Sequence, residues 1–211
     1  LYLSCNRIAD VSALSGLTEL SDLDLSHNRI ADIAPISPLW RLVWLDINDN
    51  ELKDISALPS LPYLRYLYAG NNKIRDLSPL AHLQSLTDIS LCYHKLTDIT
   101  VFPKMPALKL LELRGCRLSD ISALAPMTGV TDLDLSCNKL SDISALSALT
   151  ALNELNVSGN KISDISAVKD MKNLEALDIS NNEVADISCV EPLKLLTFLD
   201  LRFNKIRSLP K

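Results

Sequence analysis

The sequence has few of the residues on which catalysis and metal binding usually depend. Its 211 residues include three histidines and five glycines. None of the histidines occurs in a metal-ligand spacing such as H-E-x-x-H, and the scattered glycines form no phosphate-cradling loop. We therefore expect no catalytic activity, no metal site, no cofactor and no small-molecule substrate.

The sequence also lacks paired cysteines, long apolar segments and a surplus of basic residues. The five cysteines are an odd number without a C-x-x-C pair. This favours reduced thiols and a cytoplasmic location, with a secreted or cell-surface location as the alternative. No apolar run approaches the roughly 18 residues of a membrane-spanning helix, so no membrane insertion is expected. The net charge of −5 argues against nucleic-acid binding, which needs clustered lysines and arginines.

What the sequence has instead is a repeat of 22 residues. Counted from Leu20 as position 1, asparagine occupies position 9 in eight of ten repeats, and His94 and Cys116 replace it in the other two. Aspartate occupies position 13 in nine of the ten, and Ser208 departs from that column. Because the spacing never changes, each repeat is expected to form one coil of a solenoid.

Apolar residues keep the same register. Seven positions (1, 4, 6, 11, 14, 17 and 20) are apolar in all eight complete repeats, which span residues 20–195. Leucines at positions 4 and 6 alternate as one face of a short strand requires. The aspartate at position 13 suits the N-cap of a short 3-10 turn. No repeat can bury its leucines alone, so stability is expected to come from stacking.

Three segments resemble the leucine-rich repeat signature: LDLSHNRI (23–30), LDLSCNKL (133–140) and LDISNNEV (177–184). The 22-residue length and the following D-I-S-A-L or D-L-S-P-L are similar to the repeats of bacterial internalins. They are also similar to those of the leucine-rich regulatory subunit of protein phosphatase 1. The resemblance implies an α/β solenoid, a leucine-rich repeat horseshoe. Its parallel β-sheet would lie on the concave face, and short 3-10 or extended segments on the convex face.

Residues 1–211 are expected to form a single leucine-rich repeat domain of about ten repeats. The first and last repeats, residues 1–19 and 196–211, are incomplete. The chain opens inside a repeat and carries no polar caps of the kind that terminal repeats normally need. We therefore expect it to be a fragment of a longer chain.

Positions 3 and 5 flank the strand leucine and are predicted to face the concave surface. They hold ten acids and no lysine or arginine: Asp22, Asp24, Asp46, Asp88, Glu112, Asp132, Asp134, Glu154, Asp178 and Asp200. Like charges on adjacent strands are unfavourable, which indicates a surface that receives a basic partner. L-D-L is common in this repeat type, so the acids at position 5 alternatively reflect the family pattern. The acids at position 3 carry more of the prediction.

Six of the ten aromatic residues lie between residues 40 and 93. Trp44 and Tyr66 occupy position 3 of neighbouring strands, Tyr68 occupies position 5, and Tyr93 at position 8 lies on the adjoining edge. Exposed tryptophan and tyrosine are typical of interface hot spots, although incidental surface aromatics are the alternative. The predicted partner-binding residues are Trp44, Tyr66, Tyr68, Tyr93, Asp22, Asp24, Asp46, Asp88 and Glu112.

A second candidate patch lies in the last, incomplete repeat. It comprises Phe198, Arg202 and Phe203, which either contact a partner or pack against a missing C-terminal cap.

Two further features accompany the asparagine column. His94 is interpreted as a substitute donor, with a surface contact or a pH-sensitive element as the alternative. Position 10 is basic in eight of ten repeats, which indicates a solvated ridge whose charges compensate the nearby aspartates.

Together these features predict a protein-protein interaction scaffold. It would bind a folded, basic protein through an acidic and aromatic concave face. One alternative is a secreted or surface bacterial adhesin of internalin type. The other is the targeting domain of a larger enzyme.

Overall fold

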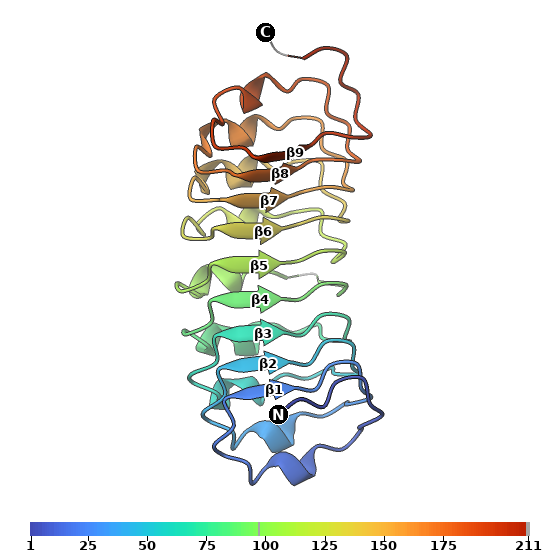
Figure 1. Cartoon of the computed structure of the whole chain (residues 1–211), viewed down its shortest axis with the longest axis vertical. Coiled ribbons are helices and arrows are strands. Elements are labelled where there is room, and N and C mark those ends of the chain that lie inside the picture. Colours follow the sequence, from blue (N-terminus) through green and yellow to red (C-terminus); the bar gives the residue numbers. More distant parts are fainter. Residues whose placement is uncertain (97, 210–211) are drawn as a thin grey trace. The chain divides into compact units, whose positions relative to one another are not determined.

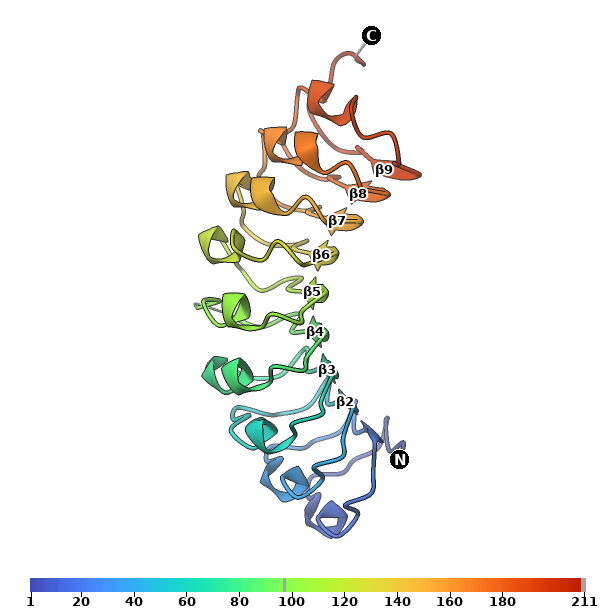
Figure 2. The ribbon, with the colours of Figure 1, turned by 90° about the vertical axis from the view of Figure 1, so that its left-hand side faces the viewer.

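The structure is a computed structural model that describes residues 1–96 and 98–209. The chain divides into two compact units, residues 1–108 and 109–211. In both units each coil carries a strand on one side and a short 3-10 turn on the other, as Figures 1 and 2 show. The predicted solenoid of strands and 3-10 turns is therefore confirmed. The assignment of residues 1–211 to a single domain stays a prediction.

The strands and turns recur at the spacing of the sequence repeat. The first unit contains η1 (Ser12–Leu14), β1 (Asp22–Asp24), η2 (Ala34–Ile36), β2 (Trp44–Asp46), η3 (Leu58–Ser60), β3 (Tyr66–Tyr68), η4 (Ser78–His82), β4 (Asp88–Ser90) and η5 (Phe102–Lys104). The second unit contains β5 (Leu110–Glu112), η6 (Ser122–Leu124), β6 (Asp132–Asp134), η7 (Ser144–Ala148), β7 (Glu154–Asn156), η8 (Ser166–Asp170), β8 (Ala176–Asp178), η9 (Ser188–Val190) and β9 (Phe198–Asp200). Every strand covers positions 3 to 5 of its repeat.

Neighbouring strands within each unit pair in parallel and without any shift in register. In the first unit Leu23 lies opposite Leu45, and Leu45 opposite Leu67. In the second unit Leu133 lies opposite Leu155, and Leu155 opposite Leu177. Residues at one repeat position therefore form a straight column across the strands. The side chains at positions 3 and 5 form the strand face, the side of the sheet turned away from the core.

The core lies between the strands and the 3-10 turns. In the second repeat Leu23 and Leu25 are fully buried, as are Ile30, Ile36 and Leu39. Ala69 and Phe102, which are unusual occupants of core positions, are at most 1% exposed. Burial of this apolar surface, at roughly 25 cal/mol per Å², is the main force that holds successive coils together.

The aspartate at position 13 organises the entry to each 3-10 turn. Asp32 Oδ1 accepts the Ala34 N–H at 2.7 Å, and Asp142 Oδ1 accepts the Ser144 N–H at 2.7 Å. The residue directly before the turn is at position 14 in most coils, for example Ile33 before η2, but at position 16 before η3 and η5. The aspartate therefore lies at least one residue before the N-cap position predicted for it. It binds the first N–H of the turn in most coils, and before η3 and η5 it binds the N–H of Ser56 and of Thr100.

The residue at position 8, which follows each strand, adopts the left-handed backbone region. His27 has a φ of 54°, Asp49 of 54° and Asn71 of 50°, and Gly159 in the second unit has a φ of 66°. Asparagine, aspartate and glycine tolerate this region best, whereas Tyr93 with a φ of 63° is a less favourable occupant.

The asparagines at position 9 form a hydrogen-bonded ladder between coils. Asn50 Nδ2 donates to the carbonyl of Leu25 at 2.9 Å in the preceding coil and to those of Ile47 and Asn48 in its own. Its Oδ1 accepts the Ile30 N–H at 2.9 Å. One carboxamide thus satisfies four backbone groups in two coils, which fixes the exit from the strand.

His94 interrupts this ladder in the first unit. Its side chain is 2% exposed, and Nδ1 lies 3.0 Å from the Leu91 carbonyl, the bond that Asn50 makes to Ile47. The interpretation of His94 as a substitute donor is therefore confirmed. Nε2 has no hydrogen-bond partner among the described residues. The Ile74 N–H, which corresponds to the Ile30 N–H, consequently lacks the carboxamide acceptor that the asparagine-bearing coils provide.

A first prediction compares a central with a terminal asparagine of the ladder. Asn50→Ala should lower the free energy of unfolding by about 2–3 kcal/mol, because it leaves several buried backbone groups unsatisfied. Asn6→Ala is the matched control and should cost about 1 kcal/mol or less, because Asn6 is exposed and donates to two carbonyls of its own coil, those of Leu3 and Ser4. Urea denaturation of the two variants measures this. Equal losses would show that the ladder does not act through burial.

A second prediction concerns pH. Burial lowers the pKa of His94 below its ordinary 6.5, against the opposing hydrogen bonds of the Leu91 and Cys92 backbone. The unfolded chain therefore binds this proton more tightly, and stability falls as the pH drops through about 6.5. His94→Asn removes this loss and returns an acceptor to Ile74. We expect a gain of about 1 kcal/mol at neutral pH and a larger gain near pH 5.5, measured by denaturation at both pH values. A variant less stable than wild type would contradict the ladder role.

Candidate functional site

The strand face of the first unit brings most of the predicted partner-binding residues together. The column at position 3 reads Asp22, Trp44, Tyr66 and Asp88 across β1 to β4. The column at position 5 reads Asp24, Asp46, Tyr68 and Ser90. Aromatic rings thus occupy the middle of the face, and acids flank them. Figure 1 shows the four strands that carry these columns.

Trp44 contacts two neighbouring aromatic rings, those of Tyr68 and Tyr2. The ring centroids of Trp44 and Tyr68 lie 6.0 Å apart, and those of Trp44 and Tyr2 lie 6.2 Å apart. Trp44, Tyr66 and Tyr68 are half-buried, whereas Tyr2 is 71% exposed. Tilted ring pairs at these distances are favourable. Tyr2 was missing from the predicted site, although its place at position 5 of the incomplete first repeat would have identified it.

The acids at position 5 hold the turn that leaves the strand. Asp24 Oδ1 accepts the Ser26 N–H at 2.9 Å and the Ser26 hydroxyl at 2.7 Å. Asp46 Oδ1 accepts the Asn48 N–H at 2.8 Å. In the second unit Asn156 accepts the Ser158 N–H in the same way. These acids therefore have a structural role that accounts for their recurrence in the repeat.

The acids at position 3 take no part in that turn. The Asp22 carboxylate accepts the hydroxyl of Ser21, and the Asp88 carboxylate accepts that of Thr87, both at 2.5 Å. These bonds join neighbouring residues and restrict only the side chains. The carboxylates at position 3 are therefore the more available for a partner, as the sequence pattern indicated.

The two position-5 carboxylates of β1 and β2 differ in their electrostatics. Burial raises the pKa of Asp46, and the neighbouring charges of Asp24 and Asp49 raise it further, against the hydrogen bond from Asn48. Burial also acts to raise the pKa of Asp24, but the hydrogen bonds from Ser26 outweigh it and lower the pKa. The repulsion between these adjacent acids is a cost that a cationic partner would relieve.

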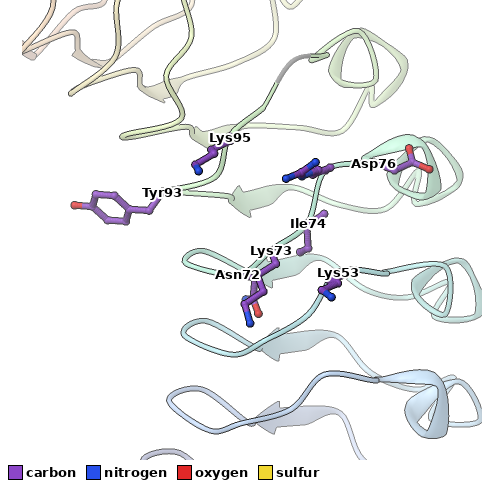
Figure 3. Close-up of a pocket in the computed structure, with 8 residues that line it drawn as sticks. Lys53, Asn72, Lys73, Ile74, Asp76, Tyr93 and Lys95 are labelled. Carbon is purple, nitrogen blue, oxygen red and sulfur yellow. The ribbon is translucent and has the colours of Figure 1, made fainter.

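Tyr93 does not lie in the strand-face columns. It belongs to the turn after β4 and is 56% exposed. There it lines a cleft with Lys53, Lys73 and Lys95, as Figure 3 shows. The structure thus assigns Tyr93 to a basic site, on an edge that adjoins the acidic face.

The second unit carries a groove of about 440 Å³ on its own strand face. Glu112 from the first predicted patch and Phe198 from the second both line it. The groove also contains four further acids from the strands: Asp132, Asp134, Glu154 and Asp178. Two residues that the sequence assigned to separate patches therefore share one acidic groove.

The remaining members of the second predicted patch lie apart from this groove. The Arg202 guanidinium forms an ion pair with Asp200, with Nη2 and Oδ2 2.5 Å apart. This pairing raises the pKa of Arg202 and lowers that of Asp200. Phe203 is 75% exposed in the turn after β9, where its φ is 56°.

A second aromatic pair in the first unit lies before the strands. The Trp40 and Tyr63 ring centroids are 6.1 Å apart, and the Arg41 guanidinium lies 4.7 Å from the Trp40 centroid. Both rings are exposed. This pair serves below as a matched control for the aromatic cluster on the strand face.

Neither a metal cluster nor a membrane-spanning helix occurs in the part of the chain that the structure describes. Its histidine, cysteine, aspartate and glutamate side chains form no group of three or more that could hold a metal ion. None of its helices is long and apolar enough to cross a membrane. None of the five cysteines, all of which lie within the described ranges, belongs to a disulfide, and Cys5 and Cys137 are exposed.

Comparisons with known proteins agree with the geometry. A family model of two leucine-rich repeats matches residues 1–38, 40–82 and 128–170, and a single-repeat model matches residues 170–190. The internalin inlF from Listeria monocytogenes is 32% identical with a TM-score of 0.82, over 97% of this chain and 67% of that one. None of the curated proteins compared with the chain matches it significantly.

Two further Listeria monocytogenes structures are similar. Internalin C2 is 28% identical with a TM-score of 0.84, over 89% of this chain and 83% of that one. The functional domain of InlJ, described as including a cysteine ladder, is 26% identical with a TM-score of 0.83. That match covers all of this chain and 45% of the InlJ chain.

In-register coils of 22 residues, an asparagine ladder and 3-10 turns opposite the strands define a solenoid that presents a surface to other proteins. The chain belongs to the leucine-rich repeat family, and its repeats are of internalin type. The fold and its relatives support a protein-interaction scaffold, and proteins of this family are in general not enzymes.

A third prediction separates the acceptor role of Asp46 from its charge. Asp46→Asn should be neutral or stabilising by up to about 1 kcal/mol at neutral pH, because the amide still accepts the Asn48 N–H and the buried charge disappears. Asp46→Ala should cost about 1 kcal/mol, because it removes the acceptor. Because folding raises the Asp46 pKa, protonation at acidic pH stabilises the folded wild-type protein. The gain in stability from Asp46→Asn should therefore shrink toward acidic pH. Thermal denaturation checks both variants. Equal losses would mean that the charge itself holds the turn.

Proposed function

We propose that the strand face of the first unit binds a folded, basic protein. The main observation in support is that Trp44, Tyr66 and Tyr68 lie next to one another on in-register strands, with acids on both sides. The Tyr2 ring extends this cluster through its contact with Trp44. Half-buried aromatic rings on this face can lose their remaining exposure to a partner without any change in the core. Because the leucine positions supply the core, these rings are not needed to fill it.

The acids give this face its preference for a basic partner. Positions 3 and 5 of β1 to β4 hold Asp22, Asp24, Asp46 and Asp88 and no base. Asp22 and Asp88 are the carboxylates without a role in the turn, so they supply charge for steering at little structural cost. In the second unit Glu112 belongs to an acidic groove that would favour the same class of partner.

Phe198 in that groove supports a second contact region, as the sequence pattern indicated. Arg202 contributes less positive charge to such a contact than its sequence position suggests, because Asp200 neutralises it. Phe203 is exposed enough to take part in a contact.

A cytoplasmic location is also a proposal, and two exposed thiols, Cys5 and Cys137, support it. The similarity to internalins favours the alternative, a secreted or surface bacterial adhesin. The second alternative, the targeting domain of a larger enzyme, has no feature among the described residues in its favour.

A fourth prediction tests the aromatic cluster. A partner is captured from an extract of the source cells on immobilised wild-type protein and then titrated against purified variants. Trp44→Ala combined with Tyr66→Ala should weaken binding at least about 30-fold, mainly through faster dissociation, because buried aromatic anchors contribute about 2 kcal/mol or more. Asp22→Asn combined with Asp88→Asn should instead slow association, and the effect should shrink at high salt.

The control for this experiment removes the same residue types from the segments that precede the strands. Trp40→Ala combined with Tyr63→Ala should leave the affinity within about twofold, because those rings lie outside the strand face. Circular dichroism should show that every variant remains folded. Loss of binding in this control, with wild-type affinity for Trp44→Ala combined with Tyr66→Ala, would place the partner elsewhere and overturn the proposal.

A further inference from the structure

The first unit contains a cleft of about 610 Å³ on the edge where the chain leaves the strands. Its walls come from the loops after β2, β3 and β4, which contribute Lys53, Asn72, Lys73, Ile74, Arg75, Asp76, Tyr93 and Lys95. Figure 3 shows Lys53 and Lys73 on one side of the cleft, Lys95 on the other, and Tyr93 at its outer rim. The volume is that of a small-molecule site.

Positive charge is concentrated here because, in neighbouring coils, two repeat positions, 10 and 12, both carry basic residues. Lys73 and Lys95 belong to position 10, which is basic in most repeats. Lys53 and Arg75 belong to position 12, which is alanine in the preceding repeats at Ala9 and Ala31. Four bases against Asp76 leave a net charge of +3 among the lining residues.

Most of this charge is not compensated within the protein. Lys73 Nζ lies 2.9 Å from Glu51 Oε2. Lys53, Arg75 and Lys95 have no carboxylate within salt-bridge distance among residues 1–96 and 98–209. Asp76 points toward the 3-10 turn, where it accepts the Ser78 N–H at 2.8 Å (Figure 3). Three cations therefore remain for an anion.

The interruption of the asparagine ladder lies beside the same cleft. Ile74 lines the cleft, and its N–H lacks a carboxamide acceptor because His94 replaces asparagine. Nε2 of buried His94 is likewise without a hydrogen-bond partner in the described part of the chain. The local departure from the repeat pattern thus coincides with the local excess of charge.

We propose that this cleft binds a phosphate monoester carried on a ring. Lys53, Arg75 and Lys95 would hold the phosphate, because its dianion matches several cations and its oxygens suit the paired N–H groups of arginine. The rest of the cleft accommodates the ring, with the Tyr93 ring at the rim as its stacking surface. The phosphate monoester is bound and not turned over. It is either a free small molecule or a phosphorylated tyrosine side chain of another protein, and the site is independent of the proposed strand-face function.

A fifth prediction tests this site by calorimetric titration at low ionic strength. The probes are phenyl phosphate, inorganic phosphate and a neutral peptide carrying one phosphotyrosine. Phenyl phosphate should bind at least about tenfold more tightly than inorganic phosphate, and its binding should weaken as salt is added. Tighter binding of the peptide would assign a protein source to the phosphate monoester, and equal or weaker binding a small molecule.

Two variants and one control assign the binding to named residues. Lys53→Ala combined with Arg75→Ala should weaken phenyl phosphate binding at least about tenfold. Tyr93→Asn should weaken phenyl phosphate but not inorganic phosphate, and asparagine suits the left-handed backbone there, as Asn71 does in the preceding coil. Lys139→Ala combined with Lys161→Ala, which removes two exposed position-10 bases of the second unit, should have no effect. Absence of binding to wild type, or an equal loss in this control, would overturn the proposal.

Discussion

The hydrogen bonds of the ladder asparagines are the constraint on which the other features of the coils depend. Each ladder asparagine connects its own coil to the coil before it. Asn50, for example, accepts the Ile30 N–H and donates to the Leu25 carbonyl, both in the preceding coil. Because the bonds recur every 22 residues, the strands stay in register. Register in turn places side chains of the same repeat position side by side. Stacking then buries leucines that no single coil could bury.

This register explains why the acids of the strand face have two different roles. Asp24 and Asp46 accept N–H groups of the turn, so a repeat protein would keep them with or without a partner. Asp22 and Asp88 lie beside the aromatic rings and contribute no bond to the turn. Among the acids of β1 to β4, Asp22 and Asp88 are therefore the carboxylates that we expect a partner to contact.

The first unit presents opposite charges on two of its surfaces. Acids and aromatic rings occupy the strand face, and the bases of positions 10 and 12 gather on the exit edge around Lys53 and Arg75. In a solenoid the repeat position decides which surface a residue occupies, so charges segregate by column. A basic protein and an anionic ligand could therefore be bound without competing for the same residues.

The sequence by itself determined the repeat, the core positions, the strand and turn order and the column that each residue joins. Those follow from the fixed 22-residue period, which is a local property of the chain. Only the tertiary structure grouped Glu112 with Phe198 in one groove, paired Arg202 with Asp200 and showed that Tyr93 lines a basic cleft. These outcomes depend on side-chain direction and on contacts between coils. A periodic pattern specifies the column of a residue but not the neighbour its side chain reaches.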